Sequence, residues 1–406
     1  MVYVQDIDGK PMMPTTRHGK VRRLLKANKA TVVNLCPFTI QLTYKSTDHK
    51  QPVTLGIDAG AKHIGFSATT EKEELFACET ILRTDIVDLL STRSQNRRTR
   101  RSRLRYRKPK FNNRVFSKKK GWVAPSVKQR IDSHLNEVNE IHKILPITKI
   151  VIEAAQFDTH KMKNPNISGI DYQNGEQLGF WNVREYVLFR DGHKCSYCKG
   201  KSKDLILNIH HIESRKTGGD SPSNLITLCE TCHKEYHKGN IDLKVRRGKS
   251  LCGAAIMGIM KWRLYDELKS RYSNVSMTFG YITKYNRIKY GIEKSHTSDA
   301  FVISKNFNAK RIEYQYLKRL VRRHNRQIHK MKILKGGKKK NNQAPFEVFG
   351  FRLFDKVLYN NEINFIYGRR KSGNFNIRDF NGENPKDVSY KKLKLIRGKR
   401  HPIILK

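Results

Sequence analysis

The pattern of hydrophobic and polar positions predicts strands in the first part of the chain. Apolar or alternating runs, bounded by polar turns, occupy residues 30–35, 38–44, 53–58, 64–69 and 75–82. Runs of this length with this alternation are typical of β-strands. Short turns join the last three runs, which favours an antiparallel meander.

Helical periodicity begins after residue 120. Apolar residues recur at intervals of three and four from Val127 to Leu145, which predicts an amphipathic helix that starts near Pro125 and is closed by Pro146. The next expected elements are a strand at 149–153, a helix at about 253–272, a strand at 275–281 and a helix at about 295–307. Polar stretches at about 158–180 and 241–252 resemble linkers, so the segment between them is expected to be inserted within another domain.

Composition adds an expected partner. The chain has 406 residues, and 82 Lys+Arg against 36 Asp+Glu give a net charge of +46. Hydrophobic residues make up 37%, which is low for one large continuous core. A charge of this size repels itself in a compact state unless a polyanion neutralises it, so nucleic acid is the expected partner. No apolar run is long enough for a transmembrane helix or a signal peptide, and we expect neither a membrane partner nor secretion.

The positive charge is concentrated in two runs. Residues 93–120 hold 14 Lys or Arg and no acid, and residues 305–340 hold 14 basic residues and one acid. Arg contacts phosphates bidentately and stacks on bases, so these runs predict nucleic-acid contacts. On composition alone, a solvated basic tail is the alternative. The expected contact residues are Arg93, Arg97, Arg98, Arg100, Arg101, Arg103, Arg105, Arg107, Arg322 and Arg323.

Two cysteine pairs predict a structural zinc site. Cys195-x-x-Cys198 and Cys229-x-x-Cys232 supply four thiolates with the spacing of a tetrahedral Cys₄ centre. Four cysteines close the coordination shell, so this Zn²⁺ would hold the fold and perform no chemistry. The alternative is two unrelated pairs of reduced thiols, in keeping with a reducing compartment.

Histidines between and after these cysteines predict a second metal centre. His233 and His237 are four residues apart and share a helix face, so with His210 from a strand they could hold one divalent cation. The adjacent His211 points to the other strand face, where it could act as a general base on water. The alternative is a zinc-knuckle binding module without catalysis.

Three acids and a histidine form the third set. Asp58 and Glu153 each end a predicted strand, and His296 and Asp299 lie three apart at the start of a predicted helix. Three carboxylates around two Mg²⁺ ions would make a phosphodiesterase site. Taken singly, each acid could equally be a turn former or a helix cap.

The Cys/His segment resembles an HNH (ββα-metal) nuclease domain of the zinc-knuckle type. The resemblance implies His211 as general base and Asn224 as a residue that orients the active-site loop or assists the metal, here Mg²⁺. His210 stands where many relatives have Asp, and in those relatives Asn224 is itself a ligand. The division of ligands among His210, Asn224, His233 and His237 therefore stays open.

The three acidic segments, GIDAG, KIVIEAAQF and HTSDA, resemble in that order a RuvC-like nuclease of the RNase H fold, split into three parts. The resemblance implies that Asp58, Glu153 and Asp299 bind metal and that His296 activates water. Ala59, and Ala154 with Ala155, depart from the residues common in relatives, but neither departure removes a ligand.

The whole order resembles the IscB family, transposon-encoded RNA-guided DNA endonucleases similar to the ancestors of type II CRISPR effectors. The first residues carry GKPMMPTTRHGKVRRLLKANKATVV and PFTIQLTY, similar to the PLMP domain of that family, with Met12 in place of Leu. The implied domains are PLMP (1–52), RuvC part I (53–90), an arginine-rich bridge helix (91–120), RuvC part II (121–160), HNH with linkers (161–252), RuvC part III (253–308) and a basic C-terminal target-adjacent-motif interaction domain (309–406).

The resemblance also implies partners and strand roles. A structured guide noncoding RNA (omega RNA) and double-stranded DNA would be the partners of a monomeric protein in a prokaryotic, cytoplasmic, nucleoid-associated ribonucleoprotein. HNH would cut the guide-paired strand and RuvC the displaced strand. In the C-terminal domain, Arg369–Lys371 or Arg378 would approach base edges of the motif.

The expected fold class is therefore α/β and multidomain: a split RNase H-like (RuvC) fold, an inserted HNH domain, a bridge helix, a small N-terminal domain and a small β-rich C-terminal domain. Two alternative functions remain. One is an unguided HNH homing or restriction-type endonuclease, which would need elements that read base edges. The other is a non-enzymatic RNA- or DNA-binding protein, although none of its expected catalytic acids and histidines is missing.

Overall fold

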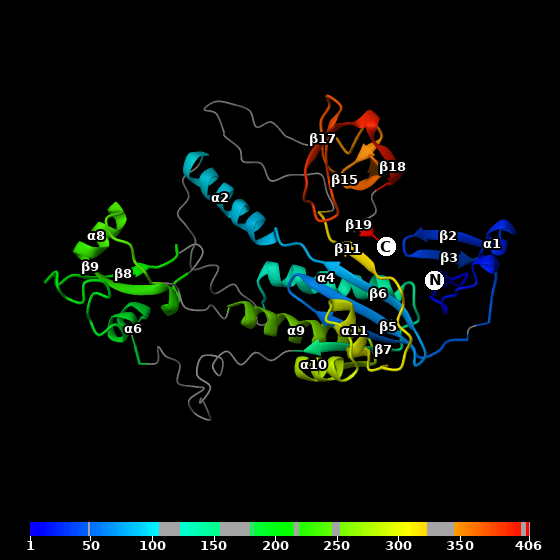
Figure 1. The fold of residues 1–406 in the computed structure, drawn as a ribbon, viewed down its shortest axis with the longest axis horizontal. Helices are drawn as coiled ribbons and strands as arrows, with labels where there is room; N and C mark the ends of the chain where they lie inside the picture. The colour runs from blue at the N-terminus through cyan, green and yellow to red at the C-terminus, as the bar shows by residue number, and fades with distance from the viewer. Residues whose placement is uncertain are drawn as a thin grey trace. The chain divides into compact units, whose positions relative to one another are not determined.

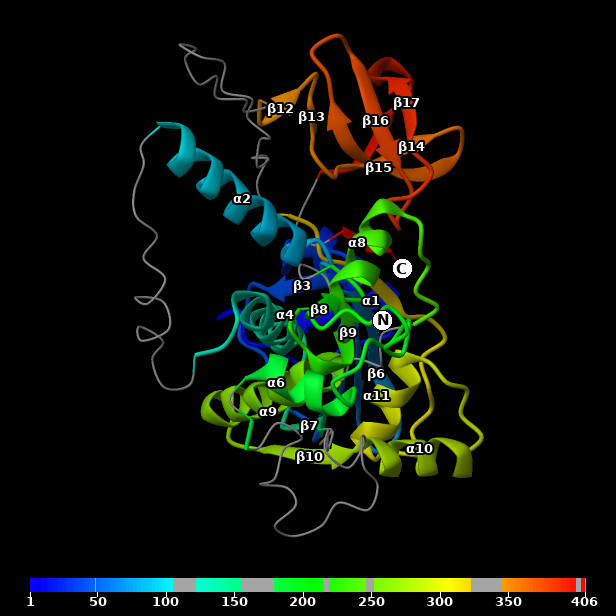
Figure 2. The same ribbon diagram turned by 90° about the vertical axis from the view of Figure 1, so that its left-hand side faces the viewer.

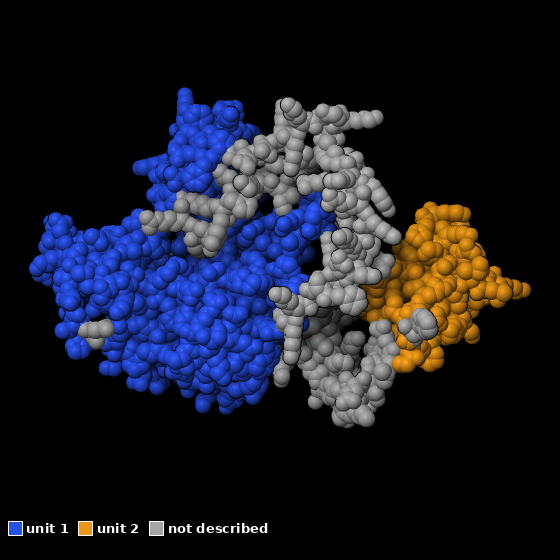
Figure 3. Space-filling view, turned by 180° about the vertical axis from the view of Figure 1, so that it is seen from behind, with its two compact units in different colours: residues 1–155, 257–406 blue, residues 156–256 orange. Residues whose placement is uncertain are grey.

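The computed structural model divides the chain into two compact units (Figures 1 and 3). Unit 1 comprises residues 1–155 and 257–406, and unit 2 comprises residues 156–256. The described residues are 1–47, 49–104, 122–154, 179–180, 182–214, 219–245, 252–322, 345–398 and 403–405, with backbone alone at 98–104, 252 and 255. Both units mix helices and strands, which confirms the expected α/β multidomain class.

A seven-stranded sheet forms the centre of unit 1. Its strand order is β10-β7-β4-β5-β6-β11-β19. The strands are β4 (Thr54–Ala59), β5 (His63–Thr69), β6 (Glu74–Ile81), β7 (Lys149–Ala154), β10 (Val275–Phe279), β11 (Tyr316–Arg319) and β19 (Ile403–Leu405). β4, β5 and β6 pair antiparallel in sequence order, so the predicted meander is confirmed.

Strands from distant parts of the chain extend the meander on both sides. β7 pairs parallel with β4, and β10 pairs parallel with β7. On the other side β11 is parallel to β6 and antiparallel to β19. Leu55 and Ile57 are fully buried, as the apolar run of β4 predicts for a central strand.

Helix α11 (His296–Ser304) packs directly on β4 and β5. Two glycines make this approach possible. A Cβ at Gly56 would lie 2.0 Å from the carbonyl oxygen of Ala300, and a Cβ at Gly65 would lie 1.9 Å from that of His296. Any side chain at these positions would therefore push the helix off the sheet.

Among the described residues, unit 1 also contains the helices α2 (Ile86–Leu104), α4 (Pro125–His142) and α10 (Gly280–Lys289). Helix α9 (Cys252–Arg271) belongs to unit 1 from residue 257 onward. α4 has Pro125 in its first turn, as predicted, and it buries Val127, Ile131, Leu135, Val138 and Ile141. Leu145, included in the predicted helix, lies beyond its end but is also buried.

Two boundary predictions were wrong. The strand expected to reach Tyr281 ends at Phe279, and α10, which we did not predict, begins at Gly280. Aromatic and β-branched residues at 281–283 suit a strand by propensity, but tertiary packing on α11 favours the helix. The arginine-rich helix begins at Ile86, before the start of the expected segment 91–120, and residues 105–120 of that segment lie outside the described residues.

The N-terminal residues form a small α/β module. Its sheet has the order β1-β3-β2, and α1 packs against it around Val21 and Ile40. The elements are β1 (Tyr3–Gln5), α1 (His18–Lys26), β2 (Ala30–Leu35) and β3 (Phe38–Leu42). The buried Tyr3 hydroxyl donates to the Leu75 carbonyl oxygen, which ties this module to β6.

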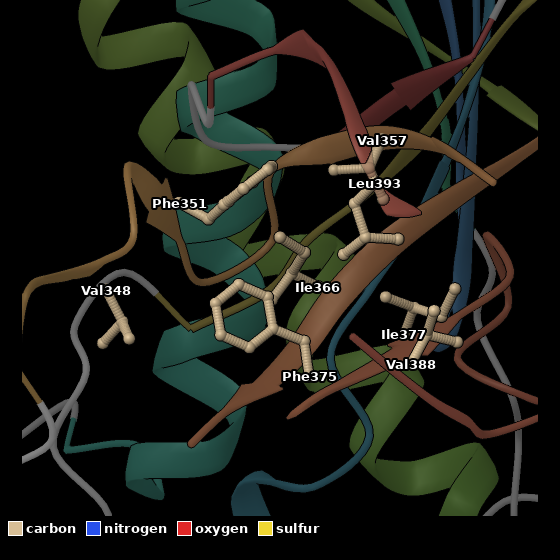
Figure 4. Close-up of a cluster of buried hydrophobic side chains, with 8 residues drawn as sticks. All are labelled: Val348, Phe351, Val357, Ile366, Phe375, Ile377, Val388 and Leu393. Carbon is tan, nitrogen blue, oxygen red and sulfur yellow. The ribbon is translucent and has the colours of Figure 1, made fainter. Parts of the chain in front are cut away.

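The C-terminal residues form the predicted small β module, whose five-stranded sheet is seen in Figure 2. The sheet order is β17-β16-β15-β14-β18. Its elements are β12 (Glu347–Val348), β13 (Phe351–Arg352), β14 (Lys356–Tyr359), β15 (Glu362–Arg369), β16 (Asn374–Arg378), β17 (Lys386–Ser389), η3 (Tyr390–Lys392) and β18 (Lys394–Arg397). Phe351, Ile366 and Phe375 are central to its own hydrophobic core (Figure 4).

Unit 2 is a short antiparallel hairpin with helices. Its described elements are α6 (Val183–Arg190), β8 (Leu207–His211), η2 (Pro222–Asn224), β9 (Leu225–Cys229) and α8 (Glu230–Lys238). Leu207 pairs with Cys229 and His211 with Leu225. Within the described part of the chain, no helix combines the length and apolar character that crossing a membrane requires.

Candidate active sites

Sheet register brings the predicted carboxylates of unit 1 to one place. Ile57 on β4 pairs with Ile152 on the parallel β7, so Asp58 and Glu153 follow at equivalent positions on neighbouring strands. Asp58 is on the same face as Gly56, which faces α11, because side chains alternate along a strand. Nδ1 of His296, in the first turn of α11, lies 2.7 Å from Oδ2 of Asp58. The structure thus assembles residues 238 positions apart in sequence.

The start of α11 holds the other two predicted residues. The Ser295 hydroxyl accepts a hydrogen bond from the backbone N–H of Ser298, which caps the helix. Burial and the negative charges of Asp58 and Glu153 raise the pKa of Asp299, although Arg287 opposes the shift. The hydrogen bond to the Asp58 carboxylate raises the pKa of His296. The effect of both Asp58 and Glu153 on Asp299 shows that these two acids lie near it.

Two cations beside these acids, the buried Lys261 and the partly buried Arg287, were not predicted. Lys261 on α9 places Nζ 3.0 Å from Oε1 of Glu153, and Arg287 on α10 places Nε 3.1 Å from Oδ1 of Asp299. The sequence did not single out Lys261 or Arg287, because it does not show which residues of each segment face the acids. Carboxylate oxygens are the ligands that hard divalent cations such as Mg²⁺ prefer, while in this structure Lys261 and Arg287 neutralise Glu153 and Asp299.

A second histidine also joins this site without having been predicted. The His63 ring on β5 stacks on the His296 ring, with centroids 5.2 Å apart and an interplanar angle of 5°. Nδ1 of His63 lies 2.7 Å from Oε1 of Glu79 on β6. His63 follows the GIDAG segment closely, so its proximity could have been inferred from the β4–β5 hairpin. His63 thus supports one face of the His296 ring.

Unit 2 brings together three of the predicted histidines. His210 lies on β8, whereas His233 and His237 lie one turn apart on α8, with their Nε2 atoms 3.3 Å from each other. One ligand atom from each of the three histidines lies within 4.8 Å of the other two. The ββα arrangement therefore produces the convergence that the i, i+4 spacing predicts.

The state of His210 fits a metal ligand. Its Nε2 atom is buried and has no hydrogen-bond partner among the residues that the structure describes. Burial, with the nearby His233, His237 and His211, lowers its pKa to about 4. The ring is thus neutral at pH 7, which is the form that binds a cation. Three imidazole ligands suit a divalent cation of intermediate softness better than they suit the hard cation Mg²⁺.

His211 and Asn224 lie beside this cluster with different partners. His211 Nε2 is 2.9 Å from Oδ1 of Asp220, a carboxylate that the sequence gave no reason to single out. The buried Asn224 side chain accepts from the N–H of Glu213 and donates to the carbonyl oxygens of Glu213 and Gly219. Asn224 therefore fixes the two ends of the loop before Asp220, and its amide is engaged there and not with the histidine cluster.

The four predicted cysteines converge as a second group in unit 2. One sulfur from each of Cys195, Cys198, Cys229 and Cys232 lies within 4.8 Å of the others. Burial opposes ionisation, but hydrogen bonds from Ser202 and from the Gly200 backbone lower the pKa of Cys198 to about 6. The sulfurs pack with Ile226 and Leu228 in the unit's small core. This donor set fits a tetrahedral structural Zn²⁺, which such a small unit needs for stability.

The predicted basic residues are only partly described. Arg93 and Arg97 are exposed on α2, and none of the described side chains of α2 is buried. The backbone of Arg98, Arg100, Arg101 and Arg103 lies in the same helix. Arg105, Arg107 and Arg323 lie outside the described residues. Arg322 is half-buried, and burial together with Arg83 lowers its pKa.

Two C-terminal arginines that were expected near base edges instead donate hydrogen bonds within the C-terminal module. Arg369 donates to the carbonyl oxygens of Pro345, Phe346 and Phe351. Arg378 donates to Asn376 and Gly382 and lies over the Tyr367 ring. Of the expected group, Arg370 and Lys371 are the exposed residues.

Comparison with protein-family models gives two matches. Residues 2–175 match the RRXRR protein family, and residues 97–101 read Arg-Arg-Thr-Arg-Arg. Residues 195–239 match the HNH endonuclease family. The second range spans all four cysteines and the five residues His210, His211, Asn224, His233 and His237. The chain thus combines an RRXRR region with an HNH endonuclease domain, and this combination agrees with the resemblance to the IscB family.

Individual relatives cover parts of the chain. A 66-residue stretch is 29% identical to anaredoxin from Nostoc sp. (strain PCC 7120 / SAG 25.82 / UTEX 2576), covering 16% of this chain and 84% of that protein. Streptococcus thermophilus Cas9 in complex with the GGAA PAM superposes with a TM-score of 0.37 at 14% identity, over 51% of this chain and 30% of that chain. The type II-C Cas9 from Actinomyces naeslundii gives 0.25 at 12% identity, over 63% and 60%. The chain spans about a quarter of the S. thermophilus Cas9 in complex with the AGAA PAM, at a TM-score of 0.33 and 14% identity.

Proposed function

We propose that the protein is an RNA-guided endonuclease that cuts both strands of double-stranded DNA beside a short target-adjacent motif. The observation that carries the proposal is the presence of two chemically different clusters of titratable side chains on two separate units. Unit 1 has Asp58, Glu153 and Asp299 near one another, with His296 beside Asp58, and unit 2 has three histidines with His211 and Asp220 nearby. Two sites provide one cut for each strand of an opened duplex.

We assign the sheet of unit 1 to a split RuvC-like, RNase H-like fold. The support is its topology, an antiparallel meander β4-β5-β6 with β7 and β10 added in parallel beside β4. Its acids come from three separated segments at Asp58, Glu153 and Asp299. These acids would hold two Mg²⁺ ions, which supply charge neutralisation at the phosphodiester when bound. A proton on Nδ1 of His296 is donated to Asp58, which leaves Nε2 to accept a proton from water.

In the HNH domain, His211 is the proposed general base. A proton on Nε2 is donated to Asp220, which leaves Nδ1 to take a proton from the attacking water. Asp220 and Asn224 act as positioning residues, because Asn224 fixes both ends of the loop before Asp220. His210, His233 and His237 would hold one divalent cation that neutralises charge on the scissile phosphate. Zn²⁺ on the four cysteines would hold the fold.

RNA guidance rests on the family resemblance and on charge. α2 is the proposed bridge helix, and among its described residues no side chain is buried. Like charges such as Arg93 and Arg97, one turn apart, destabilise an isolated helix, so a bound polyanion would stabilise it. The remaining proposed modules are a PLMP domain at 1–52 and a C-terminal domain at 309–406 that reads the target-adjacent motif. Localisation in a prokaryotic cytoplasm, with the nucleoid, belongs to the same proposal.

Strand-specific cleavage tests the function. The full chain is purified with its copurifying RNA, which is sequenced, and is given a matching duplex with each strand labelled differently. Asp58→Ala should leave only the guide-paired strand cut, and His211→Ala only the displaced strand. The double variant should still bind target, because phosphate contacts dominate affinity.

Two results would reject the assignment. Heterogeneous copurifying RNA without a common structured species would argue against guidance and favour an unguided nuclease or a binding protein. Loss of both cuts in either single variant, with target binding intact, would refute independent sites.

A further inference from the structure

Helix α10 presents an aromatic face to solvent. Tyr281, Tyr285 and Ile288 are 72%, 66% and 64% exposed. Their spacing of four and three residues puts all three on one side of the helix. The Phe279 ring just before the helix stacks parallel to the Tyr281 ring, with centroids 6.0 Å apart, and extends the surface. Exposed aromatic residues in this regular arrangement indicate a contact surface.

The opposite side of α10 holds it against the proposed RuvC site. Thr283 is buried, and Arg287 forms its ion pair with Asp299. At the start of the helix, a Cβ on Gly280 would lie 3.4 Å from Oε1 of Glu153, so the backbone passes directly beside that carboxylate. Figure 1 shows α10 next to α11 in unit 1. The exposed tyrosines are therefore carried by the same helix that touches two of the three acids.

The charge of α10 complements a nucleic acid. Its sequence GYITKYNRIK contains Lys284, Arg287 and Lys289 and no acid. Lys284 is exposed beside the tyrosine face. Tyrosine rings offer a stacking surface that accepts any base, and nearby lysines attract the phosphates between bases. A double helix hides its base faces, so the surface fits a single strand.

We propose that Tyr281 and Tyr285 form a base-stacking platform that binds single-stranded DNA and leads it into the carboxylate site. The proposal rests on the proposed function, since the strand in question is the displaced strand that unit 1 would cut. Bases stack on the two rings while Lys284 contacts the backbone. From the rings the strand would continue past the start of α10, where the Gly280 backbone lies beside Glu153.

A photo-crosslinking experiment tests the platform without cleavage. The full chain is irradiated with a single-stranded oligodeoxynucleotide carrying 5-iodouracil, and the crosslinked peptides are mapped by mass spectrometry. We expect crosslinks at Tyr281 and Tyr285, and their absence while other peptides crosslink would overturn the proposal. Preferential crosslinking of the same tyrosines to an equal-length RNA would also overturn it.

Cleavage then measures the contribution of stacking. Tyr281→Ala/Tyr285→Ala should slow displaced-strand cutting by about tenfold or more, because each stacked base contributes affinity. Guide-paired-strand cutting should stay unchanged. Tyr281→Phe/Tyr285→Phe keeps the rings and should retain the rate, whereas Tyr44→Ala, an exposed tyrosine elsewhere in unit 1, serves as control.

The outcomes separate this inference from the proposed function. If the alanine pair cuts the displaced strand within twofold of the unchanged protein, the platform is wrong even though the endonuclease stands. If the unchanged protein cuts no DNA, the proposed function fails, and the crosslinking result still decides whether the tyrosines bind single-stranded DNA.

Discussion

The two candidate sites are built in opposite ways. The carboxylate site joins β4, β7 and α11, and its closest pair, Asp58 and His296, is 238 residues apart. The histidine site lies on one hairpin and the helix that follows, between His210 and His237. One site therefore depends on the whole sheet of unit 1, whereas the other depends on a local fold supported by four cysteines.

Their electrostatics differ as well. Each of the three acids of the carboxylate site has a cationic or imidazole partner: His296 for Asp58, Lys261 for Glu153 and Arg287 for Asp299. In unit 2, burial keeps His210 neutral and its Nε2 atom without a partner among the described residues. The acid cluster is thus stabilised by protein charges, while the histidine cluster keeps open donor atoms. We expect damage to one site to leave the other intact.

The largest effect should come from Gly65→Ala. The added Cβ would lie 1.9 Å from the His296 carbonyl oxygen, so α11 must shift off β5. We expect a loss of about 3 kcal/mol or more in unfolding free energy and no detectable displaced-strand cutting, because overpacking against a backbone cannot relax easily. Urea unfolding and strand-specific cleavage measure the two effects.

Gly258→Ala on α9 is the matched control for Gly65→Ala. Outside the backbone of α9 itself and the two chain neighbours, no atom of the described residues lies within 4 Å of its added Cβ, so the substitution should be neutral or stabilise by about 0.5–1 kcal/mol, as alanine does in a helix. Full displaced-strand cutting by Gly65→Ala would show that α11 does not need its close approach to the sheet.

Cys195→Ser should damage unit 2, whereas Gly65→Ala damages unit 1. Loss of one thiolate should release Zn²⁺ and unfold the described hairpin of unit 2, because its core is formed around the sulfurs. Guide-paired-strand cutting should disappear while displaced-strand cutting continues. Metal analysis of the purified protein and the cleavage assay check this.

Cys36→Ser is the control for the zinc prediction, since Cys36 lies in unit 1 apart from the cysteine cluster. It should retain Zn²⁺ and both cuts. Equal zinc content in Cys195→Ser and the unchanged protein would refute the ligand assignment.

A pH-dependent effect on stability should come from a buried histidine of unit 1. Burial lowers the pKa of His134 on α4 to about 4. The unfolded chain takes up this proton near pH 6.5 and the folded chain only near pH 4, so stability is lost as pH falls between these values. The loss should reach about 3 kcal/mol at pH 4, measured by urea unfolding of unit 1.

His134→Gln should reduce this pH dependence relative to the unchanged protein, and the exposed His18→Gln should not. The dependence that is left in His134→Gln comes from His142 on the same helix, whose pKa burial also lowers to about 4. The same slope in all three proteins would show that His134 does not cause the acid sensitivity of unit 1.

The sequence predicted the elements whose hydrophobic residues recur at a regular interval. Alternation predicted the meander at β4–β6, and three- and four-residue steps predicted α4. It missed α10, because Tyr281, Ile282 and Thr283 suit a strand locally and only packing against α11 decides for a helix. The start of α2 at Ile86 was missed because its first turns are not basic.

The residues of the candidate sites show the same contrast between local patterns and long-range packing. Spacing alone pointed to His210, His233, His237 and the four cysteines, since these ligands come from one short segment. Lys261, Arg287, His63 and Asp220 were not predicted, because their roles depend on long-range packing or on a loop whose path spacing does not specify. Residues that act through a distant partner leave no local pattern to read.

The scattered origin of the carboxylate site has a consequence during protein synthesis. Asp58 leaves the ribosome long before His296, and the 238 residues between them take roughly 10–50 s to make at about 5–20 residues per second. Until then β4 has no α11 to pack on it, and the acids have no His296 or Arg287 beside them. A nascent chain therefore lacks the assembled carboxylate site, and under the proposed function the order of translation would delay nuclease activity until His296 has been made.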